Sequence, residues 1–286
     1  MDIKAIFMGL AFAAMWSSAF TSARVIVEYA PPLTALALRF LISGILGVVI
    51  AWALGQSARL SRRQWLGVLV FGVCQNALYL GLNFVAMQTV QASLAAIIAS
   101  TMPLLVALAG WVVLGTKVRP LGIAGLIAGV IGVTLIMGAR LQGGVDPFGL
   151  MLLVIGVISL TAATLAVLGA SSGGNVLMIV GLQMLVGSAL LWGPALAFET
   201  FAVTWNWQLV VAFIYTTLVP GLAATLVWFL LVGRIGTVKA STFHFLNPFL
   251  GVAIAAVVLG ETIGVLDVIG VAIIAGGILA VQLSKT

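Results

Sequence analysis

Long uncharged apolar segments alternate along the chain with short segments that hold the charged residues. The uncharged segments span residues 5–23, 40–58, 64–116, 120–139, 147–198, 200–233, 240–260 and 268–284. A helix needs about 20 apolar residues to cross a bilayer, so 64–116 and 147–198 each accommodate two crossings and the others one. The pattern predicts ten membrane helices, over residues 4–24, 33–54, 65–87, 92–114, 120–138, 148–170, 176–198, 207–231, 240–259 and 265–283.

Composition agrees with this pattern. Of the 286 residues, 63% are hydrophobic and 6% are charged, against about 45–50% and about 25% in soluble domains. The ten spans leave only short connections, so a soluble domain has no room. The net charge of +6 is spread over short loops, which is typical of membrane topology rather than nucleic-acid binding. We predict an all-α integral membrane protein with the bilayer as its surroundings and no nucleic-acid partner.

Basic residues set the expected orientation. If the N-terminus is cytoplasmic, the outer side and the membrane hold only Arg24, Arg39 and Arg140. The inner segments then hold nine basic residues: Lys4, Arg59, Arg62, Arg63, Lys117, Arg119, Arg234, Lys239 and Lys285. Because cytoplasmic loops are enriched in Lys and Arg, we predict that both termini are cytoplasmic and that the protein lies in the cell inner membrane.

The chain also repeats itself at an offset of 145 residues. The segment from Pro103 to Gly115 is echoed by the segment from Pro248 to Gly260. Gly125 and Gly132 likewise correspond to Gly270 and Gly277. We predict two five-helix repeats, at 1–140 and 145–286. Because five crossings place the second repeat in the opposite orientation, the repeats are inverted, as in transporters that work by alternating access.

Several short motifs carry a resemblance to a known family. They are Trp16-Ser-Ser-Ala-Phe20, Pro31-Pro32, Leu38-Arg39-Phe40 and Leu259-Gly260-Glu261. Together they resemble the ten-helix EamA branch of the drug/metabolite transporter superfamily, and within it the exporters of aromatic amino acids and methyl viologen. The resemblance implies a substrate path between the halves and outward movement of small organic solutes. The first half departs from it at Thr116-Lys117, where the family often has Glu after Leu-Gly.

The third predicted span carries a polar stripe. Asn76, Tyr79 and Asn83 share one face of an α-helix and Gln75 precedes them. Polar side chains facing lipid are expensive, so this face is expected to point into the bundle. It is either a substrate-binding cavity wall or a set of hydrogen bonds between helices.

The ninth predicted span carries a second polar group. Ser241, His244 and Asn247 precede Pro248, which opens the helix locally. His244 is the only histidine in the chain. Three interpretations remain: a proton-coupling group, a substrate contact, or a neutral histidine bonded to a neighbouring helix.

Other residues are candidates on the same reasoning. Trp16, Ser17, Gln183 and Tyr215 are candidate substrate contacts, with core packing as the alternative. Three prolines within spans are candidate hinges, with purely structural kinks as the alternative: Pro103, Pro220 and Pro248.

Two further features have alternative interpretations. Arg39 lies about 9 Å inside the second span. Its side chain either snorkels outward or is buried, bonded to helix-end carbonyls or to a substrate carboxylate. Gly125 and Gly129 form a small-residue motif that seats a neighbouring helix or a dimer partner, although an oligomer is not required.

Some chemistry is missing from the sequence. No span has an acidic residue at its middle, so the usual carboxylate route to proton-driven extrusion is absent. No nucleotide motif or metal-ligand cluster occurs, so we expect no cofactor, no metal and no ATP drive. Gly169-Ala-Ser171-Ser-Gly173 matches a hydrolase motif but falls between two spans, and we do not expect an enzyme.

These observations predict a transporter that exports small neutral or zwitterionic metabolites, amino acids foremost, by facilitated alternating access. One alternative is efflux of lipophilic cations by proton antiport, since the rings of Trp16, Tyr79 and Tyr215 attract positive charge. Outside transport, a membrane enzyme or a scaffold remains.

Overall fold

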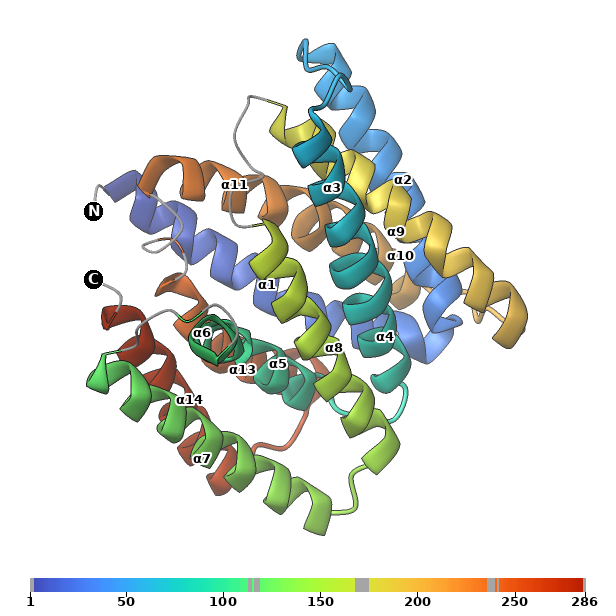
Figure 1. Cartoon of the computed structure of the whole chain (residues 1–286). Coiled ribbons are helices and arrows are strands. Elements are labelled where there is room, and N and C mark those ends of the chain that lie inside the picture. The colour runs from blue at the N-terminus through green and yellow to red at the C-terminus, as the bar shows by residue number, and fades with distance from the viewer. Residues whose placement is uncertain are drawn as a thin grey trace.

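The computed structural model describes residues 3–112, 115, 119–167, 175–235, 240 and 242–284. Within them the fold consists of helices joined by short loops (Figure 1). The first half contains α1 (Ile3–Tyr29), α2 (Pro32–Ala53), α3 (Arg62–Phe71), η1 (Gly72–Leu80), α4 (Gly81–Ala86), α5 (Ala92–Ser100), α6 (Met102–Val112) and α7 (Pro120–Gln142). The second contains α8 (Pro147–Val167), α9 (Val176–Phe198), α10 (Trp207–Thr216), η2 (Thr217–Ala223), α11 (Ala224–Ile235), η3 (Thr242–Leu246), α13 (Asn247–Leu259) and α14 (Val265–Leu283).

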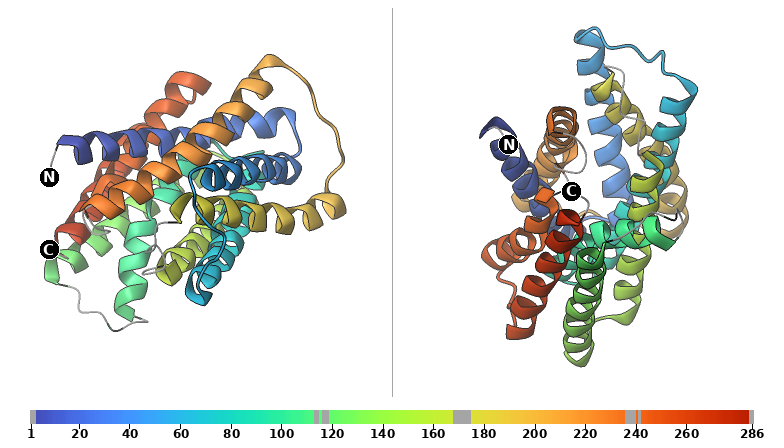
Figure 2. Two further views of the ribbon diagram at one scale, coloured as in Figure 1. Left: turned by 90° about the horizontal axis from the view of Figure 1, so that it is seen from above. Right: turned by 60° about the vertical axis from the view of Figure 1, so that its left-hand side comes forward.

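Nine helical stretches of the described chain are long and apolar enough to cross a membrane. The tenth, Phe243–Leu259, is apolar but shorter within the described residues; it includes part of the 3₁₀ segment η3, and Pro248 stands in the first turn of α13. The predicted all-α membrane fold is confirmed. α1 begins and α14 ends on the same side of the molecule (Figures 1 and 2), in keeping with ten crossings.

Three helix ends lie further along the chain than expected. α11 runs to Ile235 rather than residue 231, α1 runs to Tyr29 rather than residue 24, and α7 runs to Gln142 rather than residue 138. The sequence pattern placed the ends of α1 and α7 near an arginine, but each of these two arginines is accommodated within its helix. Arg24 donates from Nη1 to the carbonyl oxygen of Met87, and Arg140 pairs with Asp267.

Two pairs of closely packed helices flank the bundle. α2 packs along α9 and α7 packs along α14 (Figures 1 and 2). Glycines make both approaches possible: a Cβ atom on Gly47 would lie 3.1 Å from the Cα atom of Gly181. A Cβ atom on Gly125 would lie 2.6 Å from the carbonyl oxygen of Gly277, and one on Gly129 would meet Leu104 of α6. The motif of Gly125 and Gly129 therefore packs against helices of the same chain.

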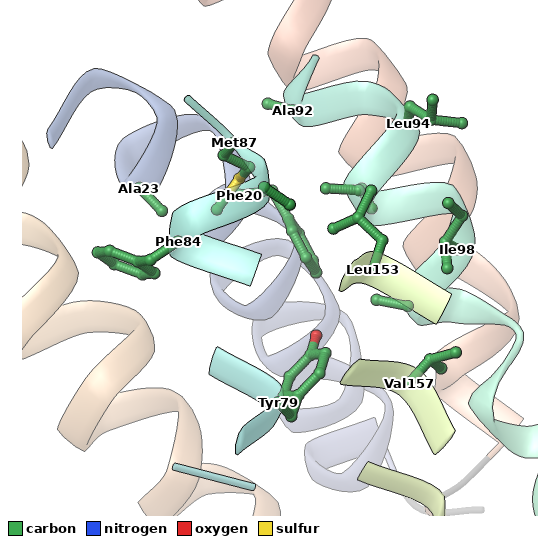
Figure 3. Close-up of a cluster of buried hydrophobic side chains, with 14 of the residues drawn as sticks. Phe20, Ala23, Tyr79, Phe84, Met87, Ala92, Leu94, Ile98, Leu153 and Val157 are labelled. Atoms are coloured by element: carbon green, nitrogen blue, oxygen red, sulfur yellow. The ribbon is translucent and has the colours of Figure 1, made fainter. Parts of the chain in front are cut away.

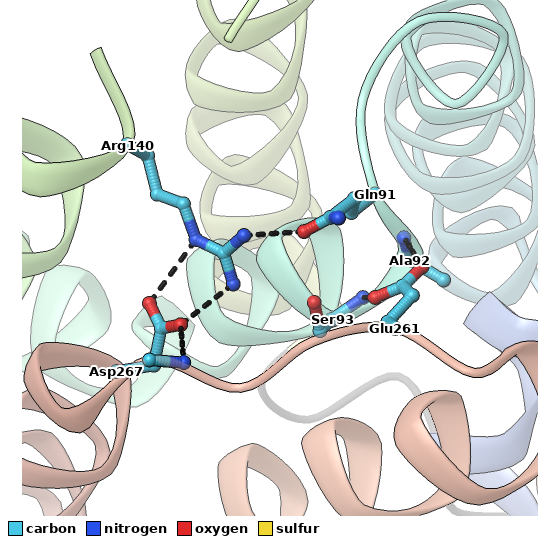
Figure 4. Close-up of polar contacts among 7 residues, drawn as sticks. Gln91, Ala92, Ser93, Arg140, Glu261 and Asp267 are labelled. Carbon is cyan, nitrogen blue, oxygen red and sulfur yellow. Dashed lines mark hydrogen bonds and ion pairs between the residues drawn. The ribbon is translucent and has the colours of Figure 1, made fainter. Parts of the chain in front are cut away.

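One end of the molecule is held together by carboxylates, and we call it the acidic end. Glu199 accepts hydrogen bonds from the N–H groups of Leu33 and Thr34 at the start of α2, at 2.7 and 2.8 Å. In Figure 4, Glu261 accepts from Ala92 and Ser93 at the start of α5, at 2.8 and 3.0 Å. Arg140 bonds both Asp267, at 3.1 and 2.8 Å, and Gln91. The Glu199 and Glu261 carboxylates satisfy backbone N–H groups that have no partner within α2 and α5. Negative charge is also stabilised at the N-terminus of a helix.

We expect Glu261→Ala to lower the free energy of unfolding by about 1–2 kcal/mol, because α5 loses two charge-assisted hydrogen bonds at its first turn. Thermal unfolding of the purified protein in detergent measures this. Glu28→Ala is the matched control, since Glu28 is exposed near the end of α1. Equal unfolding temperatures for the two variants would show that the Glu261 contacts do not stabilise the protein.

Candidate functional site

Two membrane spans contain a π-helical stretch. η1 begins at Gly72 in the third span and η2 begins at Thr217 in the eighth, the same 145-residue offset as the sequence repeat. Pro220 lies inside η2 and cannot donate a backbone hydrogen bond. π-Helical turns occur often at functional sites because they redirect side chains relative to an α-helix.

Both π-helical stretches line one internal cavity, which we call the central cavity. Its walls come from α1, α2, η1, α4, α9, η2 and α11, and therefore from both halves of the chain. The lining residues are Trp16, Ala19, Phe20, Ala23, Arg39, Phe40, Gln75, Asn76, Tyr79, Leu80, Asn83, Phe84, Met87, Gln183, Met184, Pro220, Gly221 and Thr225. The cavity volume is about 40 Å³, enough for about three water molecules. A metabolite therefore enters only when helices or side chains move apart.

The polar stripe of the third span faces this cavity. Asn76 donates from Nδ2 to the carbonyl oxygen of Gln183 on α9 at 2.9 Å, so it links two helices. Asn83 donates from Nδ2 to the carbonyl oxygen of Tyr79 at 2.8 Å. The Oδ1 atom of Asn83 and the hydroxyl of Tyr79 are buried and have no partner in the described structure. Figure 3 shows the Tyr79 hydroxyl pointing toward the middle of a cluster of apolar side chains.

Buried polar atoms without partners are costly and uncommon. Tyr79 and Asn83 are among the residues that line the central cavity, so a molecule that moves the surrounding side chains apart reaches these two atoms. Asn83 Oδ1 can accept a hydrogen bond from a solute, and the Tyr79 hydroxyl can donate or accept one. Trp16 and Phe84 add apolar surface to the same walls.

Four of the candidate contact residues do not line the central cavity. The Ser17 hydroxyl donates to the carbonyl oxygen of Asn247 at 3.4 Å and joins α1 to α13. The Tyr215 hydroxyl is 2.7 Å from Ser18 Oγ and forms a bond between α10 and α1. His244 and Asn247 also lie outside the lining. The positions 241 and 169–173 are outside the described residues.

His244 is enclosed by aromatic rings instead. Its ring centroid lies 5.3 Å from that of Phe12 and 5.0 Å from that of Trp228, with edge-on geometry in both cases. Its Nδ1 atom is 2.9 Å from Nδ2 of Asn247. Among the sequence interpretations, this packing favours a histidine that holds α1, α11 and η3 together.

We therefore expect His244→Gln to lower the unfolding temperature, because two aromatic contacts worth about 0.5–1.5 kcal/mol each are lost. Transport per folded molecule and its dependence on pH should stay close to wild type. Flux assays at several pH values, normalised to folded protein, measure both. A variant that is as stable as wild type but has lost a pH dependence would instead assign His244 to proton coupling.

The three prolines each accompany an interruption of an α-helix. Pro220 lies within η2, Pro248 is the second residue of α13, which follows η3, and Pro103 follows the break between α5 and α6. Of the three, only Pro220 lines the central cavity. The hinge hypothesis therefore has a geometric basis at each position, and at Pro220 it coincides with the cavity wall.

Arg39 does not snorkel. Arg39 is only 5% exposed and lines the central cavity. α2 begins at Pro32 and packs on α9 and η2, so the inner face of α2, which carries Arg39, points into the bundle. Arg39, one of whose sequence interpretations was a buried contact to a substrate carboxylate, and Gln75, which precedes the polar stripe, both line the cavity, and Phe84 is a lining residue that the sequence analysis did not name. The signal for Arg39 was a charge within an apolar span, which marks a functional position by default.

The comparisons with known proteins agree with a helical membrane protein. The EamA-like transporter family matches the chain twice, over residues 3–138 and 147–283. The chain belongs to the EamA-like transporter family. As a member of this family it is a multi-pass membrane transporter.

Two curated relatives of this EamA-family transporter align with most of its chain. It is 26% identical over 248 residues to an uncharacterized transporter, YvbV, of Bacillus subtilis strain 168, covering 86% of this chain and 81% of YvbV. It is 26% identical over 280 residues to an uncharacterized inner membrane transporter, YedA, of Escherichia coli K12, covering 95% of this chain and 88% of YedA. One protein of known crystal structure has the same fold, with a TM-score of 0.73 and 21% identity, covering 100% of this chain and 99% of the other.

Proposed function

We propose that this EamA-family transporter exports small zwitterionic metabolites, amino acids foremost, across the inner membrane by facilitated alternating access. The observation that carries the proposal is the central cavity with its unpaired Tyr79 hydroxyl and Asn83 Oδ1 atom. A zwitterion presents both donors and acceptors, which these groups can satisfy. No Asp or Glu is among the cavity-lining residues of the described chain, which favours facilitated movement over coupling through a titrating carboxylate.

Alternating exposure of the cavity rests on the proposed inverted repeats. Each half matches the family separately. Gly125 approaches Gly277 while Gly132 approaches Gly270. Because Gly125 corresponds to Gly270 and Gly132 to Gly277 at the 145-residue offset, the two contacts are equivalent under the proposed repeat. This relation supports two halves that rock about a shared site.

Reconstitution of the full chain into liposomes tests the function. Liposomes are loaded with a mixture of the protein amino acids, without ATP and without a pH gradient. We expect at least one amino acid to be released faster than from empty liposomes. Release only under an imposed pH gradient would contradict facilitated movement, and no release of any amino acid would contradict the substrate class.

A competition assay distinguishes amino acid export from the alternative, efflux of lipophilic cations. A quaternary ammonium compound such as methyl viologen is added in excess during amino acid release. The positive charge of Arg39 in the cavity wall opposes a cation there, so we expect little inhibition. Strong inhibition together with transport of the cation would favour the alternative.

A further inference from the structure

Arg39 occupies an unusual position in the central cavity. Its guanidinium carbon lies 5.0 Å from the ring centroid of Phe40 and 5.9 Å from that of Phe84. A Cβ atom on Gly221 would lie 3.8 Å from Nη2 and 3.9 Å from Nε of Arg39, so the guanidinium rests directly beside this glycine of η2. Two aromatic rings and a backbone without a side chain thus surround the charged group.

The charge of Arg39 has no partner in the described part of the chain. Its Nε atom is buried without a hydrogen bond. No described carboxylate lies within ion-pair distance of it, since the described residues form one ion pair, between Arg140 and Asp267. Two other arginines within helices differ: Arg24 bonds the Met87 carbonyl and Arg140 bonds Asp267 and Gln91.

An unpaired guanidinium is expensive at this depth. Arginine stays protonated in proteins, so it cannot avoid the cost of burial by losing its proton. Cation–π contacts with Phe40 and Phe84 offset only part of that cost. The planar guanidinium donates in a fork that matches a carboxylate, and such pairs are strongest where water is excluded.

We propose that Arg39 binds the carboxylate of the transported solute, so that the transporter selects solutes with a free carboxylate. This inference rests on the proposed function and narrows its substrate class. Tyr79 and Asn83, on the same cavity walls, then face the remainder of the solute, and the unpaired Oδ1 of Asn83 accepts from its ammonium group. Amides, esters and amines of the same skeleton lack the anionic group that Arg39 requires.

A carboxylate fits this site better than a phosphate. Among the described residues that line the cavity, Arg39 is the single basic one. A phosphate monoester carries up to two negative charges with three strong acceptor oxygens. One guanidinium donates two parallel hydrogen bonds to the two oxygens of a carboxylate and neutralises its single negative charge. The aromatic walls formed by Trp16, Phe20, Phe40 and Phe84 suit an aromatic skeleton, so phenylalanine and its analogues are the probes.

Binding is measured first, without transport. The full chain in detergent at fixed chloride concentration is unfolded thermally with phenylalanine, 3-phenylpropanoate or phenylalaninamide. We expect the two carboxylates to raise the unfolding temperature and the amide to leave it unchanged. Equal protection by the amide, or by added chloride alone, overturns the proposal, as does an absence of any response to the carboxylates.

Variants assign the response to Arg39. Arg39→Gln removes a buried charge without a partner, so it should raise the unfolding temperature of the ligand-free protein by about 2–4 °C and abolish protection by carboxylates. Arg39→Lys keeps the charge but not the fork and should retain a weaker response. Arg24→Gln, which loses a bond to Met87, should instead lower the unfolding temperature, and Arg59→Gln in an exposed loop should change nothing.

Transport distinguishes this proposal from the proposed function. In liposomes, Arg39→Gln should reduce release of the transported amino acid at least tenfold. Release by wild type that is unchanged in Arg39→Gln overturns the role of Arg39 and leaves amino acid export intact. Carboxylate protection that depends on Arg39, in a protein that moves no amino acid, supports the carboxylate site and overturns amino acid export.

Discussion

Replacement of Gly277 by alanine is expected to lower the free energy of unfolding by about 2–3 kcal/mol and to reduce the amount of folded protein in the membrane. A Cβ atom at position 277 would lie 2.6 Å from the carbonyl oxygen of Gly125 and 3.0 Å from the backbone nitrogen of Gly129. Real Cβ contacts are longer than 3.0 Å, so α14 must move away from α7 along the whole contact.

The neighbouring glycine provides a matched control. Gly276 lies on the exposed side of α14, and a Cβ atom there would meet nothing within 4 Å. Gly276→Ala changes the same atoms one position away, and the intrinsic helix preference alone favours alanine by about 0.8–1 kcal/mol. We expect Gly276→Ala to unfold at the wild-type temperature or slightly above it.

Thermal unfolding in detergent and the membrane abundance of tagged protein measure both variants. Equal values for Gly276→Ala and Gly277→Ala would show that α7 and α14 tolerate separation and that their close contact does not stabilise the fold. Because van der Waals packing is the main attraction between helices in lipid, the loss of a close backbone approach is not restored by apolar burial elsewhere.

The number and order of the helices could be predicted from the sequence because the bilayer imposes one length on every span. The exact ends of α1 and α7 could not. Charged residues were taken as helix ends, whereas Arg24 and Arg140 find partners on other helices and remain helical. Such partners depend on tertiary contacts between residues far apart in the sequence.

The candidate site could be predicted only in part, for a similar reason. Asn76, Tyr79 and Asn83 share a face of a regular α-helix, and they do line the cavity. Gln75 lies on the same wall, and its i, i+4 and i+8 spacing to Tyr79 and Asn83 is also compatible with one face of an α-helix. The π-helical turn of η1 itself could not be predicted. η1 contains no proline to signal it, whereas η2 contains Pro220.

In the ninth span, tertiary contacts distinguish between interpretations of His244 that the sequence leaves open. The sequence left three interpretations of His244, which stands beside Asn247 and Pro248, where the 3₁₀ segment η3 precedes α13. His244 lies between Phe12 and Trp228. These contacts depend on where α1 and α11 lie relative to η3. A local sequence pattern around His244 does not determine that arrangement.

Tyr79→Phe is expected to stabilise the protein and to impair transport at the same time. The Tyr79 residue is 1% exposed and its hydroxyl has no partner in the described structure. Removing a buried, unpaired hydroxyl relieves a desolvation cost of about 1 kcal/mol or more, so the unfolding temperature should rise. The same hydroxyl is the proposed bond to the substrate, and a lost bond to a charged group corresponds to a roughly tenfold lower flux.

Tyr215→Phe is the control, because its hydroxyl is bonded to Ser18 Oγ at 2.7 Å outside the central cavity. That variant should unfold at a lower temperature and retain its flux per folded molecule. Opposite changes in stability and flux at Tyr79, with the reverse pattern at Tyr215, would separate a substrate contact from a structural hydrogen bond. A Tyr79→Phe protein that is more stable and transports normally would leave its hydroxyl without a role, and the unpaired polar atoms among the described lining residues would then be Asn83 Oδ1 and Arg39 Nε.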